Sequence, residues 1–265
     1  MHFGLIIIGD EILSGKRTDK HLAKTIELLA ARGLQLAYAD YVGDDPQRIT
    51  ATLARAFASG DVVFSCGGIG ATPDDHTRQC AARALGRELV LHREAEALIR
   101  ERMRDVAREQ GIPYEPDRSD NIHRLNMGMF PTGAEIIPNP FNKIPGFACG
   151  SVYFLPGFPV MAHPMMEWVL ETHYRHLFVQ GAWVEQSVIV FGAMEATLTP
   201  LMEAIERDHA PVKVFSLPSV DHPQYGRHIE LGVKGSPAAV APAYAALLRG
   251  LELAQTKLGP EMVRK

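Results

Sequence analysis

Two glycine-containing acidic segments hold the residue types that could bind a phosphorylated ligand. In the first, GDEILSG at 9–15, the carboxylates of Asp10 and Glu11 are oxygen ligands of the kind that Mg²⁺ prefers. Ser14 and Gly15 follow, and their hydroxyl and backbone amide could donate hydrogen bonds to a phosphate. A polar turn closed by glycines, without any binding role, explains this segment about equally well. The segment therefore indicates a ligand site only when other candidate segments support it.

The second segment, SCGGIGATPDDHT at 65–77, has the composition of a phosphate-binding loop. Gly67, Gly68 and Gly70 crowd into four positions, which lets backbone amides approach an anion closely. The helix expected to follow adds free N–H groups and the positive end of its dipole. The loop is not a dinucleotide fingerprint, because Pro73 stands where the third glycine should be.

Three further carboxylates follow predicted strands. Asp74 and Asp75 could bind a metal ion or orient a water molecule, although aspartate is also a preferred helix N-cap. One cap is enough for one helix, so the pair favours a functional role for the other carboxylate. In VGDD at 42–45, Asp45 is explained as the cap before Pro46, which leaves Asp44 as a weaker candidate.

A proline-rich and asparagine-rich loop supplies a last group of candidates. In NPFNKIPGF, the side chains of Asn139, Asn142 and Lys143 could donate hydrogen bonds to a ligand, and LPGFP at 155–159 follows downstream. Long loops within a compact domain are usually functional. A rigid connection without a binding role is about as good an explanation.

Composition excludes several other classes of protein. The chain has 265 residues, 46% of them hydrophobic, and a net charge of -4, so we expect neither a nucleic-acid partner nor a membrane surface. The three cysteines form no metal-binding pair, and the N-terminal apolar run is too short for a signal sequence, so we expect a cytoplasmic protein. No GxSxG elbow or cysteine motif indicates covalent catalysis.

The elements that position these candidates follow an alternating pattern. Strand-like and helix-like segments alternate over the first 170 residues, which predicts an α/β domain with a parallel sheet covered by helices. Each candidate loop follows a predicted strand, so the loops should gather at one edge of the sheet. The predicted strands are 3–8, 36–42, 61–65, 134–137 and 152–155, and the predicted helices are 19–32, 46–60, 75–85, 93–110 and 159–178.

The composition shifts near residue 178. We therefore predict a domain over 1–178 and a smaller α+β domain over 179–265, in which strands and helices mix and no site is recognisable. Its last predicted helix, 237–257, has an apolar stripe around Tyr244 to Leu251, which should pack on a sheet.

Taken together and in order, the motifs GDEILSG, VGDD, GGIGATPDDHT, the loop ending in PGF, and LPGFP resemble the molybdopterin-binding (MoaB/Mog-like) domain. The likeness extends to the N-terminal part of the competence/damage-inducible protein A family. It implies a three-layer α/β/α sandwich with a mainly parallel sheet, often assembled as a homo-oligomer. In related molybdenum cofactor proteins these loops hold a pterin phosphate and a nucleotide with a divalent cation, and the competence-inducible family is associated with metal-dependent hydrolysis of ADP-ribose.

The resemblance also implies roles for particular residues. It assigns a phosphate cradle to Gly67, Gly68, Gly70 and Thr72, and an acidic, metal-facing set to Asp10, Glu11, Asp44, Asp74 and Asp75. Two departures affect the ligand: the usual loop reads close to N-x-x-G-T-A-P-G, whereas this chain has NPFNKIPG, and Ala71 replaces the proline that usually follows the glycines. The amidase domain of longer members is not found before Lys265, so deamidation of nicotinamide mononucleotide is not expected.

Our leading hypothesis is therefore a pyrophosphatase. A divalent cation, Mg²⁺ or alternatively Mn²⁺ or Co²⁺, would neutralise a pyrophosphate held by the glycine loop while water attacks phosphorus, with Asp10, Asp74 and Asp75 as catalytic residues. The alternatives are binding of molybdopterin or its adenylate in molybdenum cofactor biosynthesis, and a non-catalytic module that binds a nucleotide. All three take a small phosphorylated nucleotide or pterin as partner.

Overall fold

The chain forms two compact units. The computed structural model describes residues 1–178 and 184–264, and the chain divides into Met1–Phe178 and Val179–Lys265. Each unit has its own hydrophobic core and is described by itself below. Within the described ranges no helix combines the length and the apolar character needed to cross a membrane.

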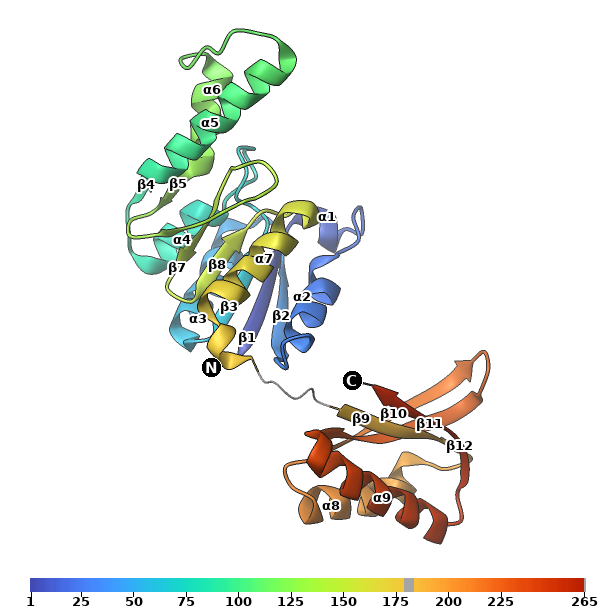
Figure 1. The fold of residues 1–265 in the computed structure, drawn as a ribbon. Coiled ribbons are helices and arrows are strands. Elements are labelled where there is room, and N and C mark those ends of the chain that lie inside the picture. The colour runs from blue at the N-terminus through green and yellow to red at the C-terminus, as the bar shows by residue number, and fades with distance from the viewer. Residues whose placement is uncertain (179–183, 265) are drawn as a thin grey trace. The chain divides into compact units, whose positions relative to one another are not determined.

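The first unit is built on a six-stranded sheet with the strand order β2-β1-β3-β8-β7-β6 (Figure 1). The four strands β2, β1, β3 and β8 are parallel, whereas β7 and β6 run antiparallel to their neighbours. The sheet is therefore mainly parallel, as predicted. Its strands are β1 (Phe3–Ile8), β2 (Leu36–Val42), β3 (Val62–Cys66), β6 (Glu135–Ile137), β7 (Gly146–Cys149) and β8 (Val152–Leu155).

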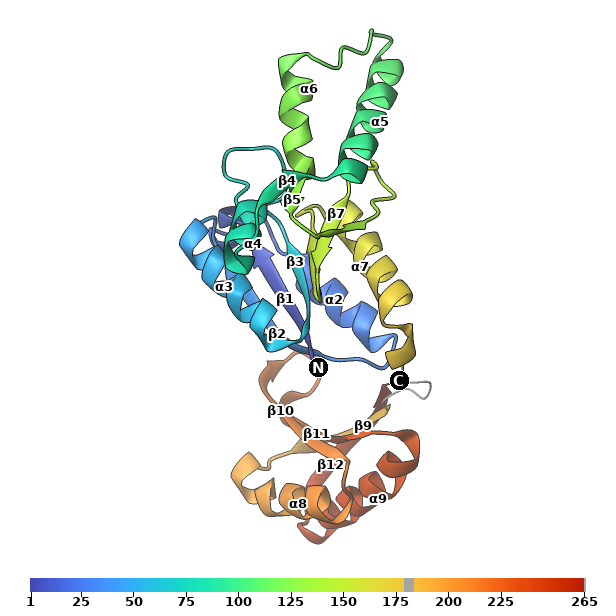
Figure 2. The same cartoon turned by 90° about the vertical axis from the view of Figure 1, so that its left-hand side faces the viewer.

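Helices cover both faces of this sheet, which makes the unit a three-layer α/β/α sandwich (Figures 1 and 2). The alternation of β1 shows why: Leu5 and Ile7 enter one core with the helices α2 and α7, while Ile6 and Ile8 enter the other with α3 and α4. The helices of the two layers are α2 (His21–Ala30), α3 (Pro46–Ser59), α4 (Thr77–Leu85) and α7 (Pro159–His173), and η2 (Arg175–Leu177) follows α7.

A helical arm projects from one end of this sandwich (Figure 2). It consists of α5 (Arg93–Gln110), α6 (Ser119–Arg124) and η1 (Leu125–Gly128), and its base is the two-stranded sheet of β4 (Leu89–Leu91) and β5 (Met129–Pro131). Ala95, Ile99 and Met103 are buried along one face of α5, while most other positions on this helix are polar.

The sheet order fixes where a ligand site should lie. The chain passes from β1 outward to β2, and then returns across β1 to β3 on its other side. This reversal creates a crevice beyond the carboxyl ends of β1 and β3, which is the place where open α/β sheets bind ligands. The short helix α1 (Asp10–Leu13) begins directly after β1 at this edge.

Several element predictions are confirmed and others are wrong. The strands predicted over 3–8, 36–42 and 152–155 have those bounds, and Asp45 caps α3 by accepting from the Arg48 amide at 2.8 Å. The prediction missed β4, β5, β7 and α6, which span three to six residues each and are too short to show a period. The helix predicted over 159–178 ends at His173.

The second unit is a four-stranded antiparallel sheet with two helices, in the order β-α-β-β-α-β. As predicted, the last helix packs on the sheet, and the Tyr244 hydroxyl donates to the Ser187 carbonyl at 3.1 Å. The final strand was missed, because Pro260 argues against a strand except at an edge, which is where this strand lies. The elements are β9 (Val184–Phe191), α8 (Glu195–Asp208), β10 (Lys213–His222), β11 (Gly226–Gly235), α9 (Pro237–Leu253) and β12 (Lys257–Arg264).

Candidate functional site

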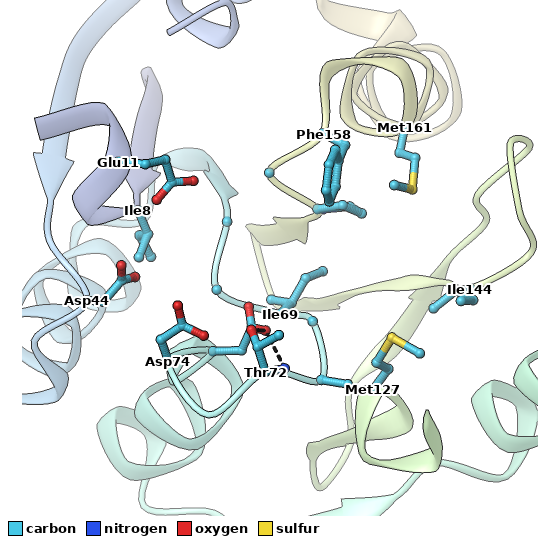
Figure 3. A pocket seen from close by; sticks show the side chains of 18 of the residues that line it. Ile8, Glu11, Asp44, Ile69, Thr72, Asp74, Met127, Ile144, Phe158 and Met161 are labelled. Atoms are coloured by element: carbon cyan, nitrogen blue, oxygen red, sulfur yellow. Dashed lines mark hydrogen bonds between the residues drawn. The ribbon is translucent and has the colours of Figure 1, made fainter. Parts of the chain in front are cut away.

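A cavity of about 380 Å³ lies at the carboxyl edge of the first unit's sheet. This volume is within the range of small-molecule sites. The loops after β1, β2, β3 and β8 converge on it, together with the loop before β7 and Met127 of η1 (Figure 3). Segments distant in sequence thus meet at the crevice that the strand order creates.

The glycine loop after β3 forms the floor of the cavity, and close backbone packing fixes its shape. Gly67 has a φ of 107°, and a Cβ atom there would lie 2.1 Å from the carbonyl oxygen of Ile8. Gly157, in the loop after β8, approaches this loop closely, since its own Cβ would lie 3.4 Å from the Gly67 Cα. Thr77 at the start of α4 secures the loop, because its hydroxyl donates to the Gly67 carbonyl at 3.0 Å.

This loop offers backbone donors and a buried positive charge. Over the part of the chain that the structure describes, the amides of Gly68, Ile69 and Gly70 donate to no protein acceptor. Behind them lies Arg78, 3% exposed, whose guanidinium donates to the carbonyl oxygens of Gly70 and Asn126. Burial lowers the pKa of Arg78 to about 10, so the group remains charged at neutral pH. Both features favour an anion at this loop.

Three carboxylates, Glu11, Asp44 and Asp74, lie along one side of the cavity (Figure 3). Partial burial raises the pKa of Asp44, and the charges of Asp10, Glu11 and Asp74 act in the same direction, while the Asp10 amide opposes them. The structure thus brings carboxylates from three loops close enough to repel one another.

Asp10 is not one of the carboxylates that line the cavity. Its Oδ1 accepts from the Asp44 amide at 3.2 Å, and the Asp10 amide donates to Asp44 Oδ2 at 2.9 Å. This reciprocal pair joins the loops after β1 and β2, and it holds the Asp10 carboxylate against Gly43, outside the lining of the cavity. The geometry gives Asp10 a positioning role instead of the predicted metal-facing and catalytic one.

The expectation that one aspartate caps the following helix is wrong. Helix α4 begins at Thr77, and its N-cap, His76, makes no capping bond with its side chain. Asp75 lines the cavity, but its side chain is bonded to its own loop. Its Oδ2 accepts from the Thr72 amide at 2.8 Å and from the Thr72 hydroxyl. The two residues close a turn, so the Thr72 amide is not available to a phosphate.

Three predicted ligand-binding residues lie elsewhere. Ser14 and Gly15 are exposed and do not line the cavity. Asn142 and Ile144, on either side of Lys143, line the cavity. The Lys143 ammonium instead pairs with Glu101 at 2.7 Å and with Asp105 at 2.6 Å, both on α5. These carboxylates raise the pKa of Lys143. Lys143 therefore anchors the loop to the arm and does not reach a phosphate in the cavity.

Asn139 does line the cavity, yet its amide is fully used in shaping the loop. It is 4% exposed, its Nδ2 donates to Asn142 Oδ1 at 2.8 Å and to the Ile144 carbonyl at 2.9 Å, and its Oδ1 accepts from the Phe141 amide.

Sequence reasoning missed the apolar and cationic lining of the cavity. Ile69, Met127 and Met161 line it, as does the guanidinium-bearing Arg17. Ile69 lies inside the recognised glycine segment at 65–77, and Arg17 lies two residues after the segment at 9–15, so their closeness to those motifs was an available signal. Met127 gave no signal, because η1 reaches the cavity only through the fold of the arm.

The carboxylates of the cavity suit a hard cation only in part. They are oxygen ligands of the right chemistry. Across the described residues, however, no group of three or more histidine, cysteine, aspartate or glutamate side chains is arranged to hold a metal ion by itself. A cation here would need further oxygen atoms from the ligand, which is how Mg²⁺ is commonly bound beside phosphates.

The first unit is a mainly parallel α/β/α sandwich with a glycine loop, free amides and carboxylates at its switch point, where proteins of this fold class bind their ligands. Comparison with known families agrees: the family described as a probable molybdopterin binding domain matches residues 4–176. The chain belongs to this molybdopterin-binding domain family, which supports a molybdopterin-related or nucleotide-binding role.

Known relatives connect the chain to CinA. A protein of Pyrobaculum calidifontis is 30% identical over 260 residues, covering 96% of this chain and 95% of that protein. A CinA-like protein of Citrifermentans bemidjiense is 30% identical over 81% of this chain, and the chain spans about half (50%) of its length. The crystal structure of CinA, of unknown function, from Thermoplasma acidophilum has a TM-score of 0.53 and 28% identity, covering 64% of this chain and 96% of that one.

Proposed function

We propose that the first unit binds a small phosphorylated nucleotide or pterin and hydrolyses a pyrophosphate bond, such as that of ADP-ribose, with a divalent cation. The observation that carries this proposal is one cavity in which the free amides of the glycine loop face the carboxylates Glu11, Asp44 and Asp74. Amides bind phosphate oxygens, whereas carboxylates would repel them. A site that has both amides and carboxylates therefore needs a cation between the carboxylates and the phosphate to offset their repulsion.

The groups at the cavity have distinct roles in this reaction. The amides of 68–70 and the charge of Arg78 behind them hold one phosphate. Glu11, Asp44 and Asp74 would hold Mg²⁺, or Mn²⁺ or Co²⁺, together with ligand oxygens, and the cation supplies charge neutralisation at the pyrophosphate. Hydrolysis adds one water across the P–O–P bridge of ADP-ribose and gives AMP and ribose 5-phosphate. No side-chain nucleophile is required.

Release of AMP from ADP-ribose tests the proposal. The purified chain is assayed with Mg²⁺, Mn²⁺ or Co²⁺ and with a chelator, and we expect AMP only with metal. Asp44→Asn and Asp74→Asn should each lower turnover about 100-fold or more, because each removes a charge that balances the cation. Asp117→Asn is the matched control, since Asp117 is exposed on the arm and lies outside the cavity lining.

The outcomes separate the three hypotheses. Metal-dependent AMP release that survives in both the Asp44 and Asp74 variants would contradict the assignment of the site. Metal-dependent binding without AMP release would favour a role in handling molybdopterin or its adenylate, a candidate that the family match supports. Binding that is indifferent to metal would favour a non-catalytic nucleotide module.

A further inference from the structure

The cavity has two chemically different halves. The carboxylates Glu11, Asp44 and Asp74 lie on one side, and the opposite side carries no carboxylate and is mainly apolar, with Ile144 and Met161 among its lining (Figure 3). If phosphates bind at the glycine loop, as the proposed function requires, the rest of the ligand faces the apolar half. The residues there decide what that part of the ligand can be.

Phe158 is the largest apolar group at the cavity and remains open to a ligand. It is the N-cap residue of α7, it is 54% exposed, and its ring projects into the cavity (Figure 3). The guanidinium carbon of Arg17 lies 6.0 Å from the ring centroid. An exposed aromatic face next to a cation is a stacking surface for a planar heterocycle.

Asn142 supplies a hydrogen-bond donor in the same half. Its Oδ1 accepts from Asn139 Nδ2 at 2.8 Å and from the Ile144 amide at 3.0 Å, which fixes the orientation of the side-chain amide. Its Nδ2 then faces the Met161 sulfur at 3.4 Å, which is a weak acceptor. Met161 lies one turn after Phe158, and its amide donates to the Phe158 carbonyl at 3.0 Å. The donor and the ring are thus neighbours.

We propose that Phe158 and Asn142 select the ring of the ligand: Phe158 stacks on a planar heteroaromatic ring, and Asn142 Nδ2 donates to an acceptor atom on the edge of that ring. This inference rests on the proposed function for the position of the phosphates. Purines and pterins both offer a flat ring with acceptor atoms on its edge, so they share the required chemistry. A ligand with only a sugar beyond its phosphates does not.

Calorimetric titration of the full chain with three probes in the presence of Mg²⁺ tests this selection. ADP and a pterin diphosphate carry a ring, whereas inorganic pyrophosphate does not. Phe158→Leu removes the aromatic face, and Phe158→Trp retains one. Asn142→Asp keeps the oxygen that the loop uses but removes the donor. Because the added charge acts on every probe, each variant is read as the ratio of ring-probe to pyrophosphate affinity.

We expect Phe158→Leu and Asn142→Asp to lower this ratio about tenfold each, and Phe158→Trp to keep it within about threefold of the unsubstituted chain. Of ADP and the pterin diphosphate, the probe whose affinity falls more in Phe158→Leu and Asn142→Asp carries the ring that the site selects. Ratios that stay unchanged in Phe158→Leu and Asn142→Asp would overturn the selection while leaving phosphate binding intact. A chain that binds none of the three probes would overturn the proposed function and this inference with it.

Discussion

Position 67 must be glycine, because both its backbone conformation and its close packing leave no room for a Cβ atom. Gly67→Ala would place a Cβ atom 2.1 Å from the Ile8 carbonyl oxygen at a φ of 107°. Gly60→Ala is the matched control, because Gly60 also has a positive φ, of 70°, with no atom within 4 Å of its Cβ position. We expect a loss of about 1 kcal/mol for the control and about 3 kcal/mol or more for Gly67→Ala, measured by urea unfolding. Equal losses would show that φ strain alone determines the cost.

Which individual residues line the cavity could be predicted only in part. Adjacent residues diverge: Glu11 faces the cavity, while Asp10 bonds the backbone of the next loop, because one step along α1 changes direction by about 100°. Sequence position could place both at the right edge of the sheet but not choose between them. For Lys143 the decisive partners, Glu101 and Asp105, come from α5 and give no local signal.

At the scale of elements, a buried histidine joins α2 to the loop that carries Phe158. His21 Nε2 lies 3.1 Å from the Gly157 carbonyl, and the ring meets that of His163 edge-on at 5.3 Å. In the described structure, His21 Nδ1 and His163 Nε2 are buried without a partner. Burial lowers the pKa of both histidines, because an added proton would be a buried charge.

The consequence is a stability that depends on pH. Since these histidines bind protons more tightly in the unfolded chain, the free energy of unfolding should decrease as pH falls below about 6.5. We expect His21→Gln to reduce this slope between about pH 6.5 and 5, by up to about 1.4 kcal/mol per pH unit. Denaturant unfolding at several pH values measures it. His123→Gln, on the exposed side of α6, should leave the slope unchanged; a slope shared by all three proteins would assign it to other groups.

Long elements were predictable because their residues repeat a pattern, and short ones were not. Strand β1 is apolar throughout and α3 has both its cap and its terminal glycine in sequence, so each could be located closely. Strand β7 follows a proline-rich loop and is four residues long, and its pairing with β8 is set by the sheet, not by its own sequence. The lining that comes from the arm was unpredictable for the same reason.

At the scale of the whole molecule, the cavity is built from the first unit alone. The lining residues of the cavity fall between Ile8 and Met161, all within the first unit. The core of the second unit forms between its own sheet and its own helices, as the burial of Val188, Leu231 and Leu247 shows. Assembly into homo-oligomers, which the family resemblance implies, stays a prediction.

Two separate cores should unfold in two steps, and a ligand should stabilise only one of them. We expect two calorimetric transitions for the full chain, of which ADP with Mg²⁺ raises one. At a ligand concentration of 100 times Kd the stabilisation of the first unit should be about 2.7 kcal/mol. Mg²⁺ alone and the Asp44→Asn chain are the controls, and neither should show the full shift. One transition that moves as a whole would mean that the units unfold together, and a shift confined to the second unit would place the ligand outside the cavity.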